Sequence, residues 1–285
     1  MAVTASSVPR GDVTATLNYY HPPADKSAAP FNFVNTPPPG QPQRNYSDAE
    51  HATLIRDLRG READFTLDRD AFQVLGGVPE SAERDFVDDD SIRRNYYPEV
   101  ERLLLDAVPG ANKVRIFDHT IRRASPNAER SPVTRVHIDQ TAPSVEKRVR
   151  RYFDADEADT LLRGRYRIVN VWRPLNKNPV ESFPLAFAST STLEDADVVP
   201  IEHRYADGYL GQTAAIRHNP AQSWYYLSGI TGSERILLEC FDSESLKPGS
   251  KIGGRVPHSA FVDPRTRPDA EGRESIEVRA LVFGP

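Results

Sequence analysis

The second part of the chain, from residue 113 onward, consists of short segments in which apolar and polar residues alternate. These segments are rich in β-branched and aromatic residues, and turn-forming residues separate them, which is typical of β-strands. Eight segments have this pattern, at residues 113–123, 132–139, 165–175, 183–190, 212–219, 223–230, 235–244 and 275–283. The pattern therefore predicts a protein that is mainly β-sheet.

Two further segments have the spacing of helices. Residues 91–108 repeat apolar side chains every three or four positions, follow three N-capping aspartates at 88–90, and end at a Pro-Gly pair. Residues 142–164 form the second helical interval. Short strands with helices packed outside them predict a double-stranded β-helix, or jelly roll, with its core over residues 113–285. A generic β-sandwich is the alternative, because the number of strands does not distinguish the two.

Residues 1–50 are rich in proline and small polar residues, which disfavour a helix or a central strand. We expect an ordered N-terminal arm over the body of the protein, because the aromatic residues of this stretch need burial. Short strand patterns at residues 13–20 and 63–75 predict a peripheral sheet. The length suits one all-β unit, so residues 1–285 are predicted to form a single domain. The sequence leaves the oligomeric state undecided, and a homodimer is one alternative, since the arm could cross to a partner subunit.

Composition and charge narrow the class of protein. The net charge is −5 and the pI is about 5.9, whereas nucleic-acid-binding proteins usually carry a basic excess. The one basic cluster, at residues 147–151, fits a solvated helix face. No apolar run is long enough to cross a membrane, and the N-terminus lacks a secretory signal. The single cysteine, Cys240, excludes an internal disulfide and is expected to be a buried thiol. We therefore expect a cytoplasmic protein without nucleic-acid or membrane partners.

Candidate chemistry begins with His137 and Asp139, which lie two residues apart in a predicted strand and therefore project from the same face. An imidazole and a carboxylate placed in this way are adjacent ligands for a divalent metal, and a second histidine completes a facial triad with open positions. His258 is the candidate, because it follows several more strands, where a jelly roll returns near its start. Gly-Gly and Pro residues just before it predict a loop or bulge that presents it. A loop histidine without a ligand role is the alternative, since an H-x-D motif also occurs by chance.

Arg273, Ser275 and Arg279 follow His258 in the last predicted strand and share one face of it. A guanidinium with a hydroxyl two residues away can bind one carboxylate, the guanidinium in a bidentate manner. This pattern fits an anchor for the far carboxylate of 2-oxoglutarate, formed by Arg273 and Ser275, with Arg279 as a second candidate. The alternative for Arg279 is a surface ion pair with Glu277.

Strand geometry selects further candidates around this site. Asn170 and Trp172 share one face of the segment at 165–175. If that face points inward, Asn170 could hydrogen-bond the cosubstrate or substrate, while Trp172 could form a wall of the pocket or belong to the core. Arg173 lies on the other face and could reach an acidic substrate or the surface. Tyr226 and the preceding tyrosine point to opposite faces, so at most one of them lines the pocket, and Tyr226 is the candidate.

Several segments together have the pattern of a known family. They are HIDQ, RIVNVWRPL, SWYYLSGITGSERILLECFDSE, PHSAFVDP and RESIEVRALVF, with VTATLNYYHPP, FTLDRDAFQVL and SIRRNYYPEVERLLL nearer the N-terminus. In combination they resemble the fungal hydroxylase/desaturase family, which is grouped with gibberellin desaturases and cephem-methoxylase-related proteins. The resemblance covers nearly the whole chain and implies an Fe(II)- and 2-oxoglutarate-dependent dioxygenase of secondary metabolism on a jelly-roll core. By motif match it assigns His137, Asp139 and His258 to the metal, and Arg273 and Ser275 to 2-oxoglutarate.

With O2, an enzyme of this kind converts 2-oxoglutarate to succinate and removes a hydrogen atom from a small-molecule metabolite. The substrate is then hydroxylated, desaturated or closed into a ring, and the sequence does not distinguish these outcomes. Two other classes have to be weighed. In a zinc-dependent hydrolase the same three residues would hold zinc and activate water. In a non-catalytic jelly-roll binding protein the three residues need not converge.

Overall fold

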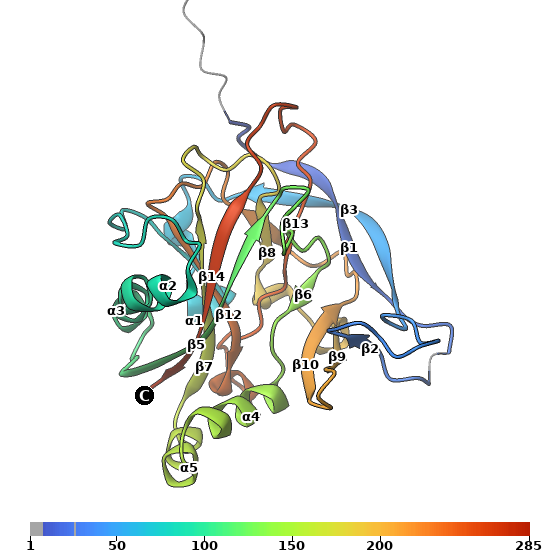
Figure 1. The fold of residues 1–285 in the computed structure, drawn as a ribbon, viewed down its shortest axis with the longest axis vertical. Coiled ribbons are helices and arrows are strands. Elements are labelled where there is room, and N and C mark those ends of the chain that lie inside the picture. The colour runs from blue at the N-terminus through green and yellow to red at the C-terminus, as the bar shows by residue number, and fades with distance from the viewer. Residues whose placement is uncertain (1–7, 26) are drawn as a thin grey trace, which may run out of the picture.

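The computed structural model describes residues 8–25 and 27–285, and the strands of this part of the chain form two β-sheets (Figure 1). The larger sheet has nine strands in the order β1-β3-β11-β8-β13-β6-β10-β9-β2. They are β1 (Val13–His21), β2 (Phe31–Phe33), β3 (Ser47–Asp57), β6 (His137–Ile138), β8 (Leu185–Ala188), β9 (Val198–Arg204), β10 (Leu210–Ile216), β11 (Trp224–Tyr226) and β13 (His258–Ala260). The smaller sheet has five, in the order β4-β12-β7-β14-β5. They are β4 (Phe72–Leu75), β5 (Lys113–Arg123), β7 (Tyr166–Pro174), β12 (Arg235–Asp242) and β14 (Glu274–Phe283).

The main hydrophobic core lies between the two sheets. The larger sheet contributes Leu17 and Ile55 to it, and the smaller sheet contributes Trp172 and Leu281. Most neighbouring strands are antiparallel; β11 with β3 and β2 with β9 are parallel pairs. Burying one face of each sheet in this way explains the alternation of apolar and polar residues along the strands. The prediction of a mainly β protein with flanking helices is confirmed.

A second core lies on the outer side of the smaller sheet, where α2 (Asp89–Asn95) and α3 (Tyr97–Ala107) cover it (Figure 1). Val100 and Leu104 of α3 pack in one cluster with Val171 of β7 and Val278 of β14. The strands β7 and β14 are therefore covered on both faces, and most of their residues are buried. This double packing gives the site described below a rigid support.

The helices occur where the sequence predicted them, but each predicted helix is divided into two. The first divides into α2 and α3 at Tyr96, next to Pro98, whose missing N–H cannot continue the hydrogen-bond ladder. The second divides into α4 (Ala142–Tyr152) and α5 (Ala155–Arg163), because Asp154 caps α5 by accepting a hydrogen bond from the Glu157 amide. Shorter helical segments are α1 (Leu67–Asp70), η1 (Glu62–Asp64), η2 (Thr190–Thr192), η3 (Asp195–Asp197) and η4 (Ser243–Leu246).

The strands that precede residue 113 belong to the two main sheets. β1 and β2 form the two edges of the larger sheet, β3 pairs with β11, and β4 pairs with β12. The prediction of a separate peripheral sheet for residues 13–20 and 63–75 was therefore wrong. Alternation in β1 buries Leu17 and Tyr19 in the main core, which ties this segment to the central sheets.

Two features of the chain as a whole bear on the sequence-based expectations. Cys240 is a free thiol buried in β12, as predicted, and burial raises its pKa well above the usual value. No helix within residues 8–25 and 27–285 combines the length and the apolar composition needed to cross a membrane.

Candidate metal centre

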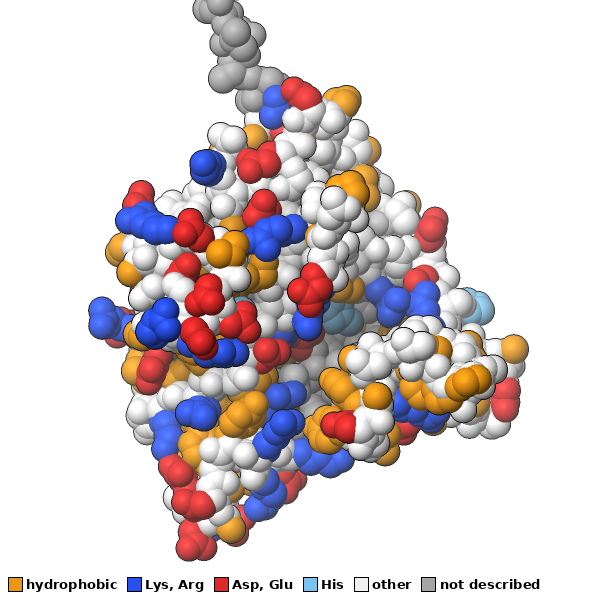
Figure 2. All heavy atoms as spheres, in the orientation of Figure 1, with side chains coloured by type: hydrophobic (Ala, Val, Ile, Leu, Met, Phe, Trp, Pro, Cys, Tyr) orange, Lys and Arg blue, Asp and Glu red, His pale blue; other side chains and the backbone are white. Residues whose placement is uncertain are grey.

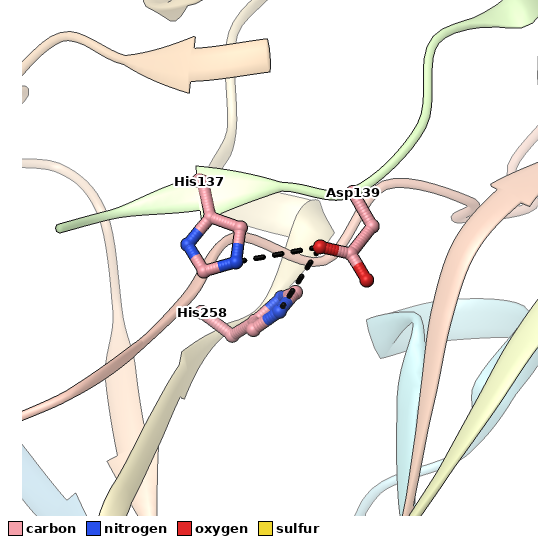
Figure 3. Close-up of side chains that lie close together, drawn as sticks. All are labelled: His137, Asp139 and His258. Carbon is pink, nitrogen blue, oxygen red and sulfur yellow. Dashed lines mark ion pairs between the residues drawn. The ribbon is translucent and has the colours of Figure 1, made fainter. Parts of the chain in front are cut away.

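His137, Asp139 and His258 converge at the inner side of the larger sheet (Figure 3). His137 of β6 and His258 of β13 are direct partners on neighbouring strands, and Asp139 follows β6 immediately. The Nε2 atom of His137 lies 3.4 Å from Oδ1 of Asp139, and that of His258 lies 3.9 Å from the same oxygen. The three ligand atoms all lie within 4.8 Å of one another. The predicted cluster therefore forms, although its members are up to 121 positions apart in the sequence (258 minus 137).

Backbone contacts orient both imidazole rings. Nδ1 of His137 lies 2.8 Å from the carbonyl oxygen of Arg135, and Nδ1 of His258 lies 3.1 Å from that of Val256. Each Nδ1 must carry the proton to donate to a carbonyl, which leaves the lone pair of Nε2 directed at the centre of the cluster. A metal-binding histidine usually has its other ring nitrogen anchored in this way.

The electrostatics of the cluster favour the metal-binding protonation states. Burial, and then the neighbouring His137, lower the pKa of His258, which keeps its imidazole neutral. Burial alone would raise the pKa of Asp139, but the Arg279 guanidinium and the two histidines hold it well below its usual range. Two neutral imidazoles and one carboxylate form the donor set of a divalent transition metal with several open positions. The residues present therefore fit an iron ion.

One cavity adjoins the cluster, and it is lined by His137, His258, Arg273, Ser275 and Trp172. It lies between the two sheets, and the surface shows a hollow between the side that carries α2 and α3 and the lobe formed by β2, β9 and β10 (Figure 2). Nη1 of Arg273 donates a hydrogen bond of 2.7 Å to the Phe183 carbonyl, and its guanidinium lies 5.6 Å from the ring centroid of Trp172. Its Nε is buried without a hydrogen-bond partner in the described structure.

Two charged residues that the sequence analysis did not assign to the cosubstrate site, Arg122 and Glu277, line the same cavity. Burial, and then the Arg122 guanidinium, lower the pKa of Arg273 to about 9. Arginine stays charged at neutral pH, so this shift reports an unfavourable burial of two like charges that a bound anion would relieve. Arg122 of β5 lies opposite Ser275 of β14 in the sheet. Only the pairing of β5 with β14 could have identified Arg122 as a residue of the site, because no recognisable sequence motif surrounds Arg122.

Asn170 and Arg279, which we expected to contact the cosubstrate, instead contact the carboxylate of Asp139. Nδ2 of Asn170 and Nε of Arg279 each donate a hydrogen bond of 2.9 Å to Oδ2 of Asp139. Arg279 also forms the ion pair with Glu277 that was the alternative expectation. This pair is not on the surface, because the two side chains are only 13% and 12% exposed.

The remaining two candidates, Arg173 and Tyr226, are absent from the lining of the cavity. The guanidinium of Arg173 lies on the outer face of β7, 5.0 Å from the ring centroid of Phe86, because side chains alternate along a strand. The hydroxyl of Tyr226 donates a hydrogen bond of 2.7 Å to the carbonyl of Gly11. Neither residue lines the cavity next to the metal candidates, and a contact of either with the substrate stays a prediction from the sequence.

Comparisons with known proteins agree with this geometry. Residues 17–283 match the family model described as "Oxidoreductase/YMDC permease-like domain". The hydroxylase/desaturase poxK of Penicillium oxalicum is 38% identical, over 99% of this chain and 94% of the relative. The alpha-ketoglutarate-dependent dioxygenase phiK of a fungal species is 33% identical, over 96% of each chain. These relatives support neither a zinc hydrolase nor a non-catalytic binding protein.

Among solved structures, the iron and alpha-ketoglutarate-dependent endoperoxidase NvfI superposes with a TM-score of 0.85. The two chains are 28% identical, and the match covers 97% of this chain and 99% of that one. The likeness extends over both sheets and the helices, and it confirms the predicted double-stranded β-helix. The chain therefore belongs to the fungal hydroxylase/desaturase family of Fe(II)/2-oxoglutarate-dependent dioxygenases, whose cofactors are Fe(II), 2-oxoglutarate and O2.

Proposed function

We propose that His137, Asp139 and His258 bind Fe(II) in this enzyme, and that Arg273 with Ser275 binds the far carboxylate of 2-oxoglutarate. The observation that carries the proposal is the convergence of three ligand atoms within 4.8 Å beside a cavity that contains a buried, largely unpaired guanidinium. A carboxylate entering the cavity would relieve the repulsion between Arg273 and Arg122 and satisfy the free Nε of Arg273.

The residues of the chain orient both reactants and limit the access of water. Carbonyl oxygens fix the rings of His137 and His258, while Trp172 and the Phe183 carbonyl hold the guanidinium of Arg273. Apolar side chains, Val133, Leu185 and Ala260, complete the cavity wall and lower the local dielectric. Bound Fe(II) supplies the activation of O2, which is coupled to decarboxylation of 2-oxoglutarate and ends in removal of a hydrogen atom from the substrate.

We propose a metabolite of fungal secondary metabolism as the substrate, and hydroxylation, desaturation or oxidative ring closure as the outcome. The names of the relatives support this range, since they include hydroxylase, desaturase and endoperoxidase. The net charge of −5 supports the further proposal that nucleic acid and membrane surfaces are not partners. A cytoplasmic location and a homodimer stay predictions from the sequence.

Succinate formation tests the metal assignment. We expect release of succinate that requires Fe(II) and 2-oxoglutarate in the native protein, and its loss by at least about 100-fold in His137→Ala and in Asp139→Ala. His21→Ala is a matched control, because His21 is exposed at the end of β1 and bonded only to Ser47. Full turnover in the doubly substituted protein, with both His137→Ala and Asp139→Ala, would exclude this metal site.

The mass of the product distinguishes the outcomes. Candidate metabolites are screened for succinate release above the uncoupled background, and the product of each active compound is weighed. A gain of one oxygen atom indicates hydroxylation, whereas a loss of two hydrogen atoms indicates desaturation or ring closure. Tight binding of zinc with no response to 2-oxoglutarate would instead favour a hydrolase.

A further inference from the structure

The two oxygens of the Asp139 carboxylate have different surroundings. Oδ1 faces the histidines, 3.4 Å from Nε2 of His137 and 3.9 Å from Nε2 of His258. Oδ2 points the other way and accepts two hydrogen bonds of 2.9 Å, one from Asn170 and one from Arg279. The lone pairs of Oδ2 are thereby occupied, whereas Oδ1 is the oxygen that the dashed lines join to both imidazoles in Figure 3.

The donors to Oδ2 come from the opposite sheet. Asn170 on β7 and Arg279 on β14 are direct partners in the ladder of the smaller sheet. Asp139 follows β6 of the larger sheet, so both hydrogen bonds cross the space between the sheets. Asn170 is fully buried, and the side chain of Arg279 is 13% exposed. Two adjacent side chains on a rigid, doubly packed sheet therefore hold one oxygen of the carboxylate.

The guanidinium of Arg279 has little capacity for any other ligand. Nε donates to Asp139, Nη1 donates to Thr120 Oγ1 at 2.8 Å and Asp118 Oδ2 at 3.3 Å, and Nη2 donates to Glu277. Four of its five N–H groups are thus engaged, by the count of these bonds. Arg273 differs, because its one hydrogen bond in the described structure goes to a backbone carbonyl. The two arginines of β14 are consequently suited to different tasks.

We propose that Arg279 and Asn170 are positioning residues that restrict Asp139 to binding the metal through Oδ1 alone. An octahedral metal held by two imidazoles and one carboxylate oxygen keeps three open positions, whereas a carboxylate that binds through both oxygens leaves two. Chelation of 2-oxoglutarate requires two positions and O2 requires a third. Holding Oδ2 away from the metal therefore preserves the position for O2. This inference rests on the proposed function, since it presupposes the three metal ligands.

Titration with Co(II), without turnover, tests the proposal. The anaerobic protein is titrated with Co(II), whose visible absorption reports the number of ligands, and then with 2-oxoglutarate. Arg279→Met removes the donors at similar length, and Asn170→Leu removes the neutral amide donor while keeping the same side-chain branching. We expect about 10- to 100-fold weaker Co(II) binding and a changed visible spectrum in both variants. Arg173→Lys is the control, because Arg173 lies on the outer face of β7 and should leave both measurements unchanged.

Two outcomes would overturn the inference. An unchanged Co(II) affinity and spectrum in folded Asn170→Leu would show that the donors do not set the geometry of Asp139. Unchanged Co(II) binding with loss of 2-oxoglutarate binding in Arg279→Met would make Arg279 a cosubstrate anchor. If Arg279→Met does not fold, because Glu277 and Asp118 lose their partner, Asn170→Leu alone decides. Failure of the proposed function is distinguishable, since His137→Ala would then bind Co(II) as tightly as the native protein.

Discussion

At the scale of single residues, Arg273 and Arg279 lie on the same face of β14, yet their hydrogen bonds differ. Arg279 is bonded to four acceptors, while Arg273 is buried with its Nε free and another arginine nearby. Burial of a cation with few partners costs free energy, and a bound carboxylate reduces that cost. The unmet hydrogen-bonding capacity of Arg273 thus supports the proposal that Arg273, and not Arg279, anchors the dicarboxylate.

Replacing Arg273 with glutamine tests this distinction. We expect the KM for 2-oxoglutarate to rise by at least about 30-fold, because truncating a buried charge pair costs about 2–5 kcal/mol. The affinity for Fe(II) or Co(II) should not change, since Arg273 makes no contact with the three metal ligands. Arg173→Gln, on the outer face of the same sheet, is the matched control. An unchanged KM for 2-oxoglutarate would transfer the anchoring role to Arg122.

The sequence predicts which side chains of one strand lie together, but it does not predict contacts between the two sheets. His137 and Asp139 could be paired from sequence, because the period of a strand places both on one face. The same rule placed Asn170 and Trp172 on one face of a strand, and the structure shows that this face points inward, since Asn170 reaches Asp139 and Trp172 lines the cavity. The period of a strand could not predict that the side chains of Asn170 and Arg279 donate hydrogen bonds to Asp139. That contact depends on the separation of the two sheets, which no local pattern encodes.

At the scale of elements, length did not decide which strands were predicted: the short strands β8 and β11 lie in predicted segments, whereas β3, with eleven residues, was missed. β5, β7 and β14 have nine to eleven residues, rich in β-branched and aromatic side chains, and their positions match the prediction closely. β13 has three residues, and the Gly-Gly and Pro before it pointed to a loop. β9 contains Pro200, which argues against a strand. It is tolerated because the pairing of β2 with β9 involves only residues 202–204, so Pro200 has no partner on that side.

The packing of α3 on the smaller sheet leads to a prediction at this scale. Leu104 is fully buried among β-strand residues of the outer core. Leu104→Ala should lower the free energy of unfolding by about 2–5 kcal/mol, through lost burial and a residual cavity. Urea unfolding of the native and substituted proteins measures the change. Leu105→Ala on the same helix is the control, since Leu105 is 37% exposed and should change stability by about 0.5 kcal/mol or less.

The same experiment tests whether the helix supports the site. Equal stability of Leu104→Ala and Leu105→Ala would mean that α3 contributes little to holding the sheet. A destabilised Leu104→Ala protein that still binds Co(II) normally below its unfolding transition would show that the metal ligands depend on the inner core. We expect the latter, because the three ligand candidates lie on the larger sheet, away from α3.

At the scale of the whole molecule, segments from the two ends of the chain meet beside the larger sheet. Arg265 Nη1 donates to the carbonyl oxygens of Arg10, Gly11 and Asp12, and Arg10 Nη1 donates to Ser228. With β1 paired to β3, these contacts join residues from the beginning of the described chain to the loop after β13. The N-terminal segment of the described chain is thus tied to the body of the protein by side-chain hydrogen bonds as well as by the pairing of β1 with β3.

Tyr226 lies at the centre of this junction, where its hydroxyl joins the N-terminal segment to Arg265. The side chain is 1% exposed, and its hydroxyl donates to the Gly11 carbonyl and accepts a hydrogen bond of 2.8 Å from Arg265. Tyr226→Phe should lower the free energy of unfolding by about 1–2 kcal/mol, because it removes both hydrogen bonds of the hydroxyl of a buried side chain. Tyr225→Phe is the control, since the Tyr225 hydroxyl has no hydrogen bond in the described structure.

Urea unfolding and steady-state turnover are measured on both variants. A fall in kcat or a rise in substrate KM at unchanged stability in Tyr226→Phe would support the substrate role. If Tyr226→Phe loses the expected stability but keeps its kinetic constants, Tyr226 acts by joining the N-terminal segment to the loop after β13.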